Sequence, residues 1–153
     1  MSLKVTSANQ PTTADAIGGF ERSRGVSFPS AYKEFLLTSN GGVPEAALFP
    51  IEGMALNPNG VVQAFFGIDA EWPTSDLAKV HDLFANGIPA GIVPIAGNGM
   101  GDYVCLDLRN GRERIAFWDK RHFWSTGEWR ETDLYHIANS FGEFLASLRP
   151  NPV

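Results

Sequence analysis

Three side chains in the second half of the chain are of types that could perform acid–base chemistry. Asp102 and Asp119 each fall at an end of a predicted strand, and His122 follows three residues after Asp119. Such groups act as general acid and base when they reach one substrate bond held in a cleft. Aspartates at strand ends more often bond nearby backbone amides, so a small hydrolytic site is only the second alternative.

The sequence offers little for nucleophilic or metal chemistry. Cys105 is the only cysteine and lies within a predicted strand among apolar neighbours, which favours a structural thiol. His81, His122 and His136 are scattered at spacings that match no metal-binding pattern. The glycine-rich loop 97–101 joins two predicted strands and opens no helix, which favours a turn over a phosphate-binding loop. We therefore expect no catalytic residue, no metal ion and no cofactor.

Two segments, residues 69–73 and 119–129, place aromatic rings beside charged side chains, which suits contact with another protein. The ring of an exposed tryptophan can fill a pocket on a partner while neighbouring carboxylates meet lysine or arginine. The alternative is that these rings pack over the sheet and contact no partner. Both interpretations remain for Trp72 and Trp124, whereas Trp118 is expected in the core. The candidate partner-binding residues are Asp69, Glu71, Trp72, Asp102, Asp119, His122 and Trp124.

The length and charge of the chain limit the functions that it can have. A chain of 153 residues fits one domain, which buries roughly 68–70% of the surface exposed by the unfolded chain. The net charge of -5 disfavours a nucleic-acid binder and suits a basic protein partner, although it also keeps a small domain soluble. No apolar segment approaches the ~18 residues of a membrane span, and no leader-like segment precedes the fold. We expect cytoplasmic residence and no membrane contact.

Apolar spacing and capping residues predict four helices. The first begins after Thr12 or Thr13 and ends at Gly25, and the second begins at Pro29 and ends at Asn40. The third is capped by Ser75 and ends at Asn86. The last is capped by Thr132 or Asp133 and runs from Leu134 to Leu148.

Five strands are predicted from apolar and alternating runs, namely 46–51, 61–68, 92–96, 103–108 and 114–118. The last three form a β-meander through turns at 97–101 and 109–113, of which the second is either a tight Asn-Gly reversal or a longer loop. In the middle strand of the meander one face is expected to meet the core. Residues 57–60 are a predicted turn, and residues 120–131 a predicted loop. We expect one α+β domain over 1–153, with a twisted, mainly antiparallel sheet and helices packed against it.

The order of these motifs resembles the SUKH superfamily, which includes bacterial toxin-immunity proteins and a fungal regulator of cell-wall synthesis. The amino-terminal part of the resemblance is carried by Glu21, Gly25, Phe28-Pro29, Tyr32, Phe35-Leu36 and Asn40-Gly41-Gly42. The later part is carried by Ile88-Pro89, Val93-Pro94-Ile95-Ala96, Gly101-Asp102, Cys105-Leu106-Asp107, Phe117-Trp118-Asp119 and Ser140-Phe141-Gly142-Glu143-Phe144-Leu145. It covers roughly residues 14–148. Phe28 replaces the family's usual aliphatic residue, and many members have a histidine directly after the aspartate that corresponds to Asp119.

This resemblance implies a non-catalytic protein-binding module, an immunity protein that neutralises a toxin by covering its active surface. Many toxins of this class attack nucleic acid and are basic, so an acidic inhibitor would be drawn to them electrostatically. The first alternative is a regulatory or scaffolding protein of the fungal type, whose partner would be endogenous.

Overall fold

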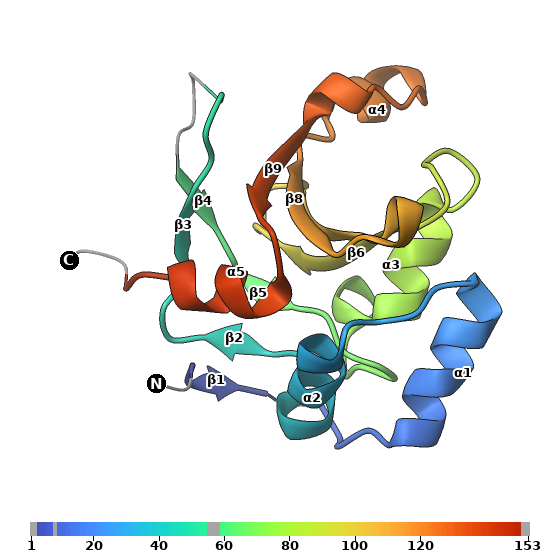
Figure 1. The fold of residues 1–153 in the computed structure, drawn as a ribbon, viewed down its shortest axis with the longest axis vertical. Coiled ribbons are helices and arrows are strands. Elements are labelled where there is room, and N and C mark those ends of the chain that lie inside the picture. Colours follow the sequence, from blue (N-terminus) through green and yellow to red (C-terminus); the bar gives the residue numbers. More distant parts are fainter. Residues whose placement is uncertain (1–2, 8, 55–58, 151–153) are drawn as a thin grey trace.

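An antiparallel sheet of five strands, in the order β5-β6-β7-β8-β9, lies at the centre of the computed structural model (Figure 1). The structure describes residues 3–7, 9–54 and 59–150. The strands of this sheet are β5 (Ala64–Phe65), β6 (Ile92–Gly97), β7 (Tyr103–Asp107), β8 (Arg114–Trp118) and β9 (Leu134–Ala138). The predicted meander is therefore confirmed, since β6, β7 and β8 are consecutive antiparallel neighbours.

Two smaller strand pairs and five α-helices complete the described part of the α+β domain. The strand pairs are β1 (Val5–Thr6) with β2 (Val43–Pro44) and β3 (Leu48–Pro50) with β4 (Asn59–Val61). The helices are α1 (Ala14–Arg24), α2 (Ser30–Ser39), α3 (Leu77–Phe84), α4 (Arg121–Thr126) and α5 (Phe141–Ser147). Short 3-10 turns occupy Pro73–Ser75, Arg109–Gly111 and Glu131–Asp133.

Capping residues set most helix ends as predicted. The hydroxyl of Thr13 accepts the Ala16 amide at 3.1 Å and begins α1, and Gly25 ends it at a φ of 66°. Asn40 ends α2 in the left-handed region, at a φ of 47°. The expected cap of α3 was wrong by one residue. Asp76, not Ser75, accepts the Lys79 amide at 3.0 Å, because a carboxylate at this position reaches the first free amides of the helix.

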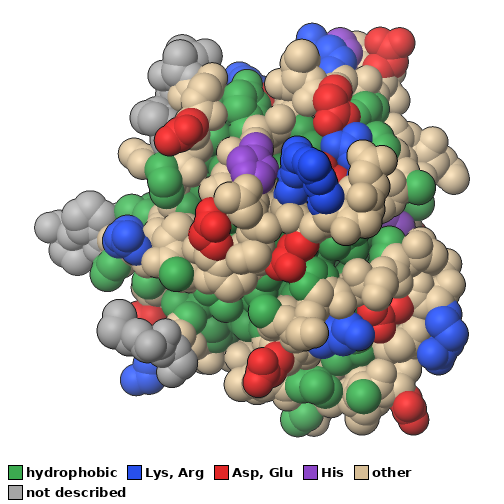
Figure 2. Space-filling view, viewed as in Figure 1, with side chains coloured by type: hydrophobic (Ala, Val, Ile, Leu, Met, Phe, Trp, Pro, Cys, Tyr) green, Lys and Arg blue, Asp and Glu red, His purple; other side chains and the backbone are tan. Residues whose placement is uncertain are grey.

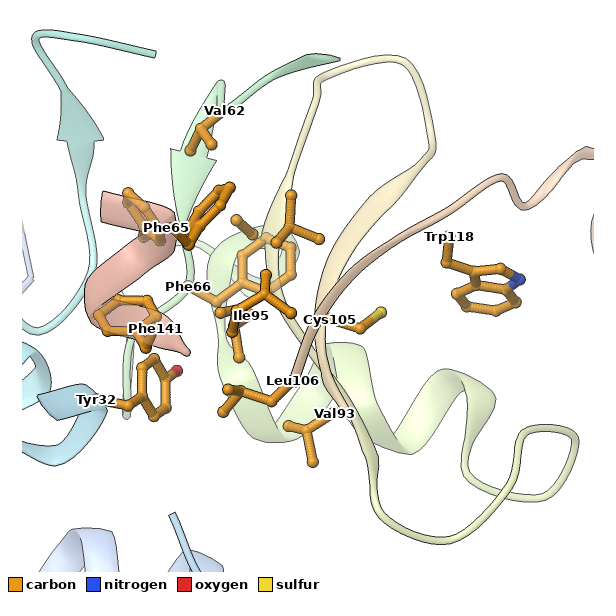
Figure 3. Packing of buried hydrophobic residues seen from close by; sticks show 14 of the residues in the cluster. Tyr32, Val62, Phe65, Phe66, Val93, Ile95, Cys105, Leu106, Trp118 and Phe141 are labelled. Atoms are coloured by element: carbon orange, nitrogen blue, oxygen red, sulfur yellow. The ribbon is translucent and has the colours of Figure 1, made fainter. Parts of the chain in front are cut away.

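The sheet is covered on both faces, which corrects the expectation that one face of β7 would meet the core. Val104 to Asp107 are all buried. On one face, α2 and α5 supply rings such as Tyr32 and Phe141, whose centroids lie 5.0 Å apart and which are drawn together in Figure 3. On the other face, the ring centroids of Phe84, in α3, and Trp118 lie 5.3 Å apart. Trp118 is drawn well apart from Tyr32 and Phe141 in Figure 3.

The carboxyl-terminal segment differs most from its prediction. The expected helix over 134–148 is two elements, the strand β9 and the helix α5, because Leu134–Ala138 completes the sheet against β8. Ser140 then caps α5 by accepting the Glu143 amide at 3.0 Å. Pairing at the sheet edge thus outweighs an apolar spacing that suits a helix equally well.

Three further segments also differ from the predicted elements. The expected strand 61–68 is divided between the end of β4 and the short β5, and the expected strand 46–51 is reduced to β3. The expected loop 120–131 contains α4. The predicted turn at 57–60 lies partly outside the described residues, whose next members, Asn59 and Gly60, belong to β4.

Candidate partner-binding surface

The loop that carries Trp72 lies on the surface and presents both a ring and acidic groups. Trp72 is 64% exposed, and Asp69 and Glu71 on the same loop are exposed as well. Neither carboxylate forms an ion pair with any described residue. The acidic loop, residues 69–72, therefore offers an exposed aromatic side chain and, in the residues before it, two carboxylates that have no ion-pair partner among the described residues.

Asn40 fixes the start of the acidic loop. Its side chain is buried, at 1% exposure, because it lies between the end of α2, the amino-terminal segment and the loop. Nδ2 donates to the carbonyls of Gln10 at 2.8 Å and Ile68 at 2.9 Å, and Oδ1 accepts the Ile68 amide at 2.8 Å. Asn40, the first residue of the Asn-Gly-Gly motif, thus holds the acidic loop as well as ending a helix, a role that its position at a predicted helix end does not reveal.

Two further side chains hold the next amides of the acidic loop. Asn9 donates from Nδ2 to the Asn40 carbonyl at 2.7 Å and accepts the Glu71 amide on Oδ1 at 2.9 Å. Asp76, which is 5% exposed, accepts the Ala70 amide on Oδ1 at 2.9 Å. Because its backbone is held within the fold, this loop would lose little conformational entropy if it bound another molecule.

The other candidate acids are engaged within the molecule. Two strands end in the same Asp-x-Arg arrangement, Asp107 with Arg109 after β7 and Asp119 with Arg121 after β8. In each, one carboxylate oxygen accepts the arginine's backbone amide at 3.2 Å while the carboxylate also receives the guanidinium. The hydrogen bond from Arg121 holds the pKa of Asp119 below its usual range. Asp119 is only 7% exposed, so it supports the surface and contributes little area to it.

Asp102 and Trp124 flank Lys120, at the start of α4. Asp102 accepts the Lys120 amide on Oδ1 at 2.9 Å, so its carboxylate is also partly used within the fold. Trp124 is 77% exposed, and its ring lies 4.7 Å from the ammonium nitrogen of Lys120. His122, on α4, lies with Nε2 at 3.8 Å from a carboxylate oxygen of Glu128.

The structure brings the seven candidate residues together as two groups. Asp76, at the start of α3, binds the acidic loop. Phe84, at the end of α3, meets Phe123 of α4 edge-on, with ring centroids 5.8 Å apart. Since α3 has eight residues, the two groups are separated by about 12 Å of helix. Figure 1 accordingly shows α4 at the top of the molecule and the start of α3 below it. Charged side chains of both signs are interspersed on the face in Figure 2.

These geometries suit contact better than bond breaking. A general acid needs a raised pKa, but the pKa of Asp119 is lowered by Arg121. Burial raises the pKa of the Cys105 thiol, which disfavours the nucleophilic thiolate. Among the described residues, no group of three or more histidine, cysteine, aspartate or glutamate side chains is placed to hold a metal ion. None of the described helices has both the length and the apolar character needed to cross a membrane.

The chain is similar in sequence to known proteins over most of its length. The chain is similar to a protein of Bacillus subtilis (strain 168) described as an SPbeta prophage-derived uncharacterized protein, YokK. The two are 30% identical over 156 aligned positions, which cover 92% of this chain and 77% of the Bacillus protein. Residues 11–147 match the SMI1 / KNR4 family (SUKH-1), which lies within the SUKH superfamily. The chain therefore belongs to the SMI1 / KNR4 family.

Proposed function

We propose that this protein is an immunity protein, which neutralises a toxin by binding it without breaking any bond. The observation that carries this proposal is the acidic loop, where Trp72 is 64% exposed and follows two exposed acids, Asp69 and Glu71, that have no ion-pair partner among the described residues. Membership of a family whose members act through protein–protein contacts supports it. The similarity to a protein described as prophage-derived is consistent with a gene carried on a mobile element.

The acidic loop has the properties of an interface anchor. Tryptophan side chains dominate binding energy in many interfaces, because a large ring buries apolar area at a small cost in side-chain entropy. Asn9, Asn40 and Asp76 hold the backbone amides that precede Trp72, so the main chain that carries this ring is fixed. Asp69 and Glu71 would then meet lysine or arginine side chains at the rim, which mainly raises the association rate.

The partner that fits this surface is a basic toxin domain. The net charge of -5 attracts such a domain at long range, and screening by salt weakens the attraction beyond about 10 Å at 0.1 M. In this role the protein acts in the cytoplasm of the cell that it protects.

Co-expression with the product of a neighbouring toxin-like gene tests the proposal. The two proteins should co-purify, and the cells should survive expression of the toxin. Trp72→Ala should weaken binding by at least about 30-fold, the effect of an interface hot spot of ~2 kcal/mol. Glu71→Lys should slow association, and the difference from wild type should shrink as salt is added.

Two variants elsewhere on the surface serve as controls. Glu45→Lys makes the same charge change at an exposed position next to β2, and Val43→Ala truncates a side chain that is 52% exposed. Both should bind as wild type does. If no complex forms and no protection is seen, the immunity role is wrong. If a complex forms but Trp72→Ala binds like Val43→Ala, the acidic loop is not the anchor.

A further inference from the structure

A hollow of about 310 Å³ lies between the loop after β6 and the start of α4, away from the acidic loop. It is lined by Met100, Gly101, Asp102, Lys120, Arg121 and Trp124. The apolar side chains at its rim are unusually open, since Met100 is 71% exposed and Trp124 is 77% exposed. Methionine, tryptophan and arginine are all enriched in protein–protein interfaces.

Lys120, which is buried along most of its side chain, contributes an ammonium group to this hollow. The residue is 8% exposed, and its ammonium nitrogen lies 5.0 Å from the ring centroid of Phe84, 5.1 Å from that of Tyr103 and 4.7 Å from that of Trp124. These rings attract the positive charge, but they offer no lone pair to its three N–H donors. No carboxylate of the described chain lies within 4 Å of the ammonium nitrogen, and no described acceptor bonds it.

The neighbouring charges do not satisfy this ammonium group. The nearby carboxylate of Asp119 is already bound by Arg121, at 2.7 Å. Asp102 uses Oδ1 to accept the Lys120 backbone amide, and Oδ2 accepts a longer bond of 3.4 Å from Asn98. Burial lowers the pKa of Lys120, and the charge of Asp102 opposes this shift only in part. A second carboxylate entering the hollow would therefore gain both a counter-charge and hydrogen-bond donors.

We propose that the hollow binds a glutamate or aspartate side chain of the partner protein, with an adjacent apolar side chain packed on Met100 and Trp124. This inference rests on the proposed function for the identity of the partner. It adds a contact whose charge is opposite to that of the acidic loop. An acidic loop and one ammonium group without an ion-pair partner among the described residues, separated by the length of α3, would fix the orientation of the partner and reject proteins with the wrong charge pattern.

A titration with two blocked dipeptides tests the hollow without any toxin. N-acetyl-leucyl-glutamate amide carries the proposed carboxylate and apolar group, and N-acetyl-leucyl-glutamine amide is its neutral isostere. We expect the glutamate peptide to give saturable NMR shifts of the Trp124 indole N–H and the Lys120 side-chain methylene. The glutamine peptide should give shifts at least tenfold smaller at the same concentration.

The variant Lys120→Met removes the charge while keeping an unbranched side chain of similar length. It should abolish the response to the glutamate peptide, whereas Arg112→Met, which removes an exposed arginine outside the hollow, should not. Equal responses to the two peptides, or no response in the wild type up to about 50 mM, would overturn the inference. The comparison of peptides on wild-type protein remains decisive if Lys120→Met fails to fold. Failure to find a toxin partner would leave this titration unaffected, so the two proposals fail separately.

Discussion

Asn40→Gly should destabilise the protein by about 2–3 kcal/mol, because three side-chain hydrogen bonds of about 1 kcal/mol each are lost at a buried position. Asn40→Ala should cost about 1 kcal/mol more. Asn40 has a φ of 47° and a ψ of 53°, and a β-carbon on alanine is disfavoured in this left-handed region, where glycine is not. The two substitutions together separate the hydrogen bonds from the backbone conformation.

Urea unfolding at pH 7 measures these differences. With a slope of about 2 kcal/mol per molar urea, the midpoint should fall by about 1–1.5 M for Asn40→Gly. Asn110 is the matched control, since it is exposed and has a φ of 61° but makes no side-chain hydrogen bond with the described residues. Asn110→Ala should lose only the conformational ~1 kcal/mol, and Asn110→Gly should be close to wild type. An Asn40→Gly midpoint within about 0.3 M of wild type would refute this assignment of the buried amide.

Three other substitutions or reactions test separate features of the fold. Arg109 lowers the pKa of Asp107, outweighing the opposite effect of burial, so this pair stabilises the fold above about pH 4 and is lost as the pH falls through the lowered pKa. Arg109→Leu also removes the two hydrogen bonds from Arg109 to Glu131, whose pKa Arg109 lowers as well. The substitution should therefore cost about 2 kcal/mol at pH 7 and less at pH 2.5, by urea unfolding at both values. Gly60→Ala should cost about 2 kcal/mol or more, since its β-carbon would overlap the ring of Phe49, and Phe49→Leu should recover part of the loss. Cys105 is fully buried, so mass spectrometry should find it unalkylated by iodoacetamide in the native protein and fully alkylated in denaturant.

Helix ends and the β-meander, which depend on residues close together in the chain, could be predicted from the sequence. Thr13, Gly25 and Asn40 mark helix ends because a side-chain acceptor or a left-handed backbone is needed there whatever the rest of the chain does. The meander was readable for a similar reason, since alternating runs lie between short turns. Elements that depend on a distant partner were not readable. Leu134–Ala138 pairs with β8, and the spacing of its own apolar residues does not indicate that the edge of the sheet is free to pair with it.

The sequence contains a capping signal for α5. Ser140 and Glu143 have the spacing of a helix start, and the Glu143 side chain accepts the Asn139 amide at 3.3 Å. Read in this way, the helix begins after Ser140, and the residues before it become a candidate strand. The short α4 had no comparable signal, because no side chain caps its first residue.

The sequence predicted candidate partner-binding residues, but it did not show which of their acids would be paired within the fold. Asp107 and Asp119 have an arginine two residues later, and at the end of a strand this spacing brings backbone amide and guanidinium to the same carboxylate. Asp69 and Glu71 have no basic residue at that spacing, and they remain exposed beside Trp72. An acid next to an aromatic ring therefore indicates a partner surface only when the chain itself supplies no nearby cation. By that criterion the acidic loop, and not the Asp119 region, carries the charge that a basic partner would meet.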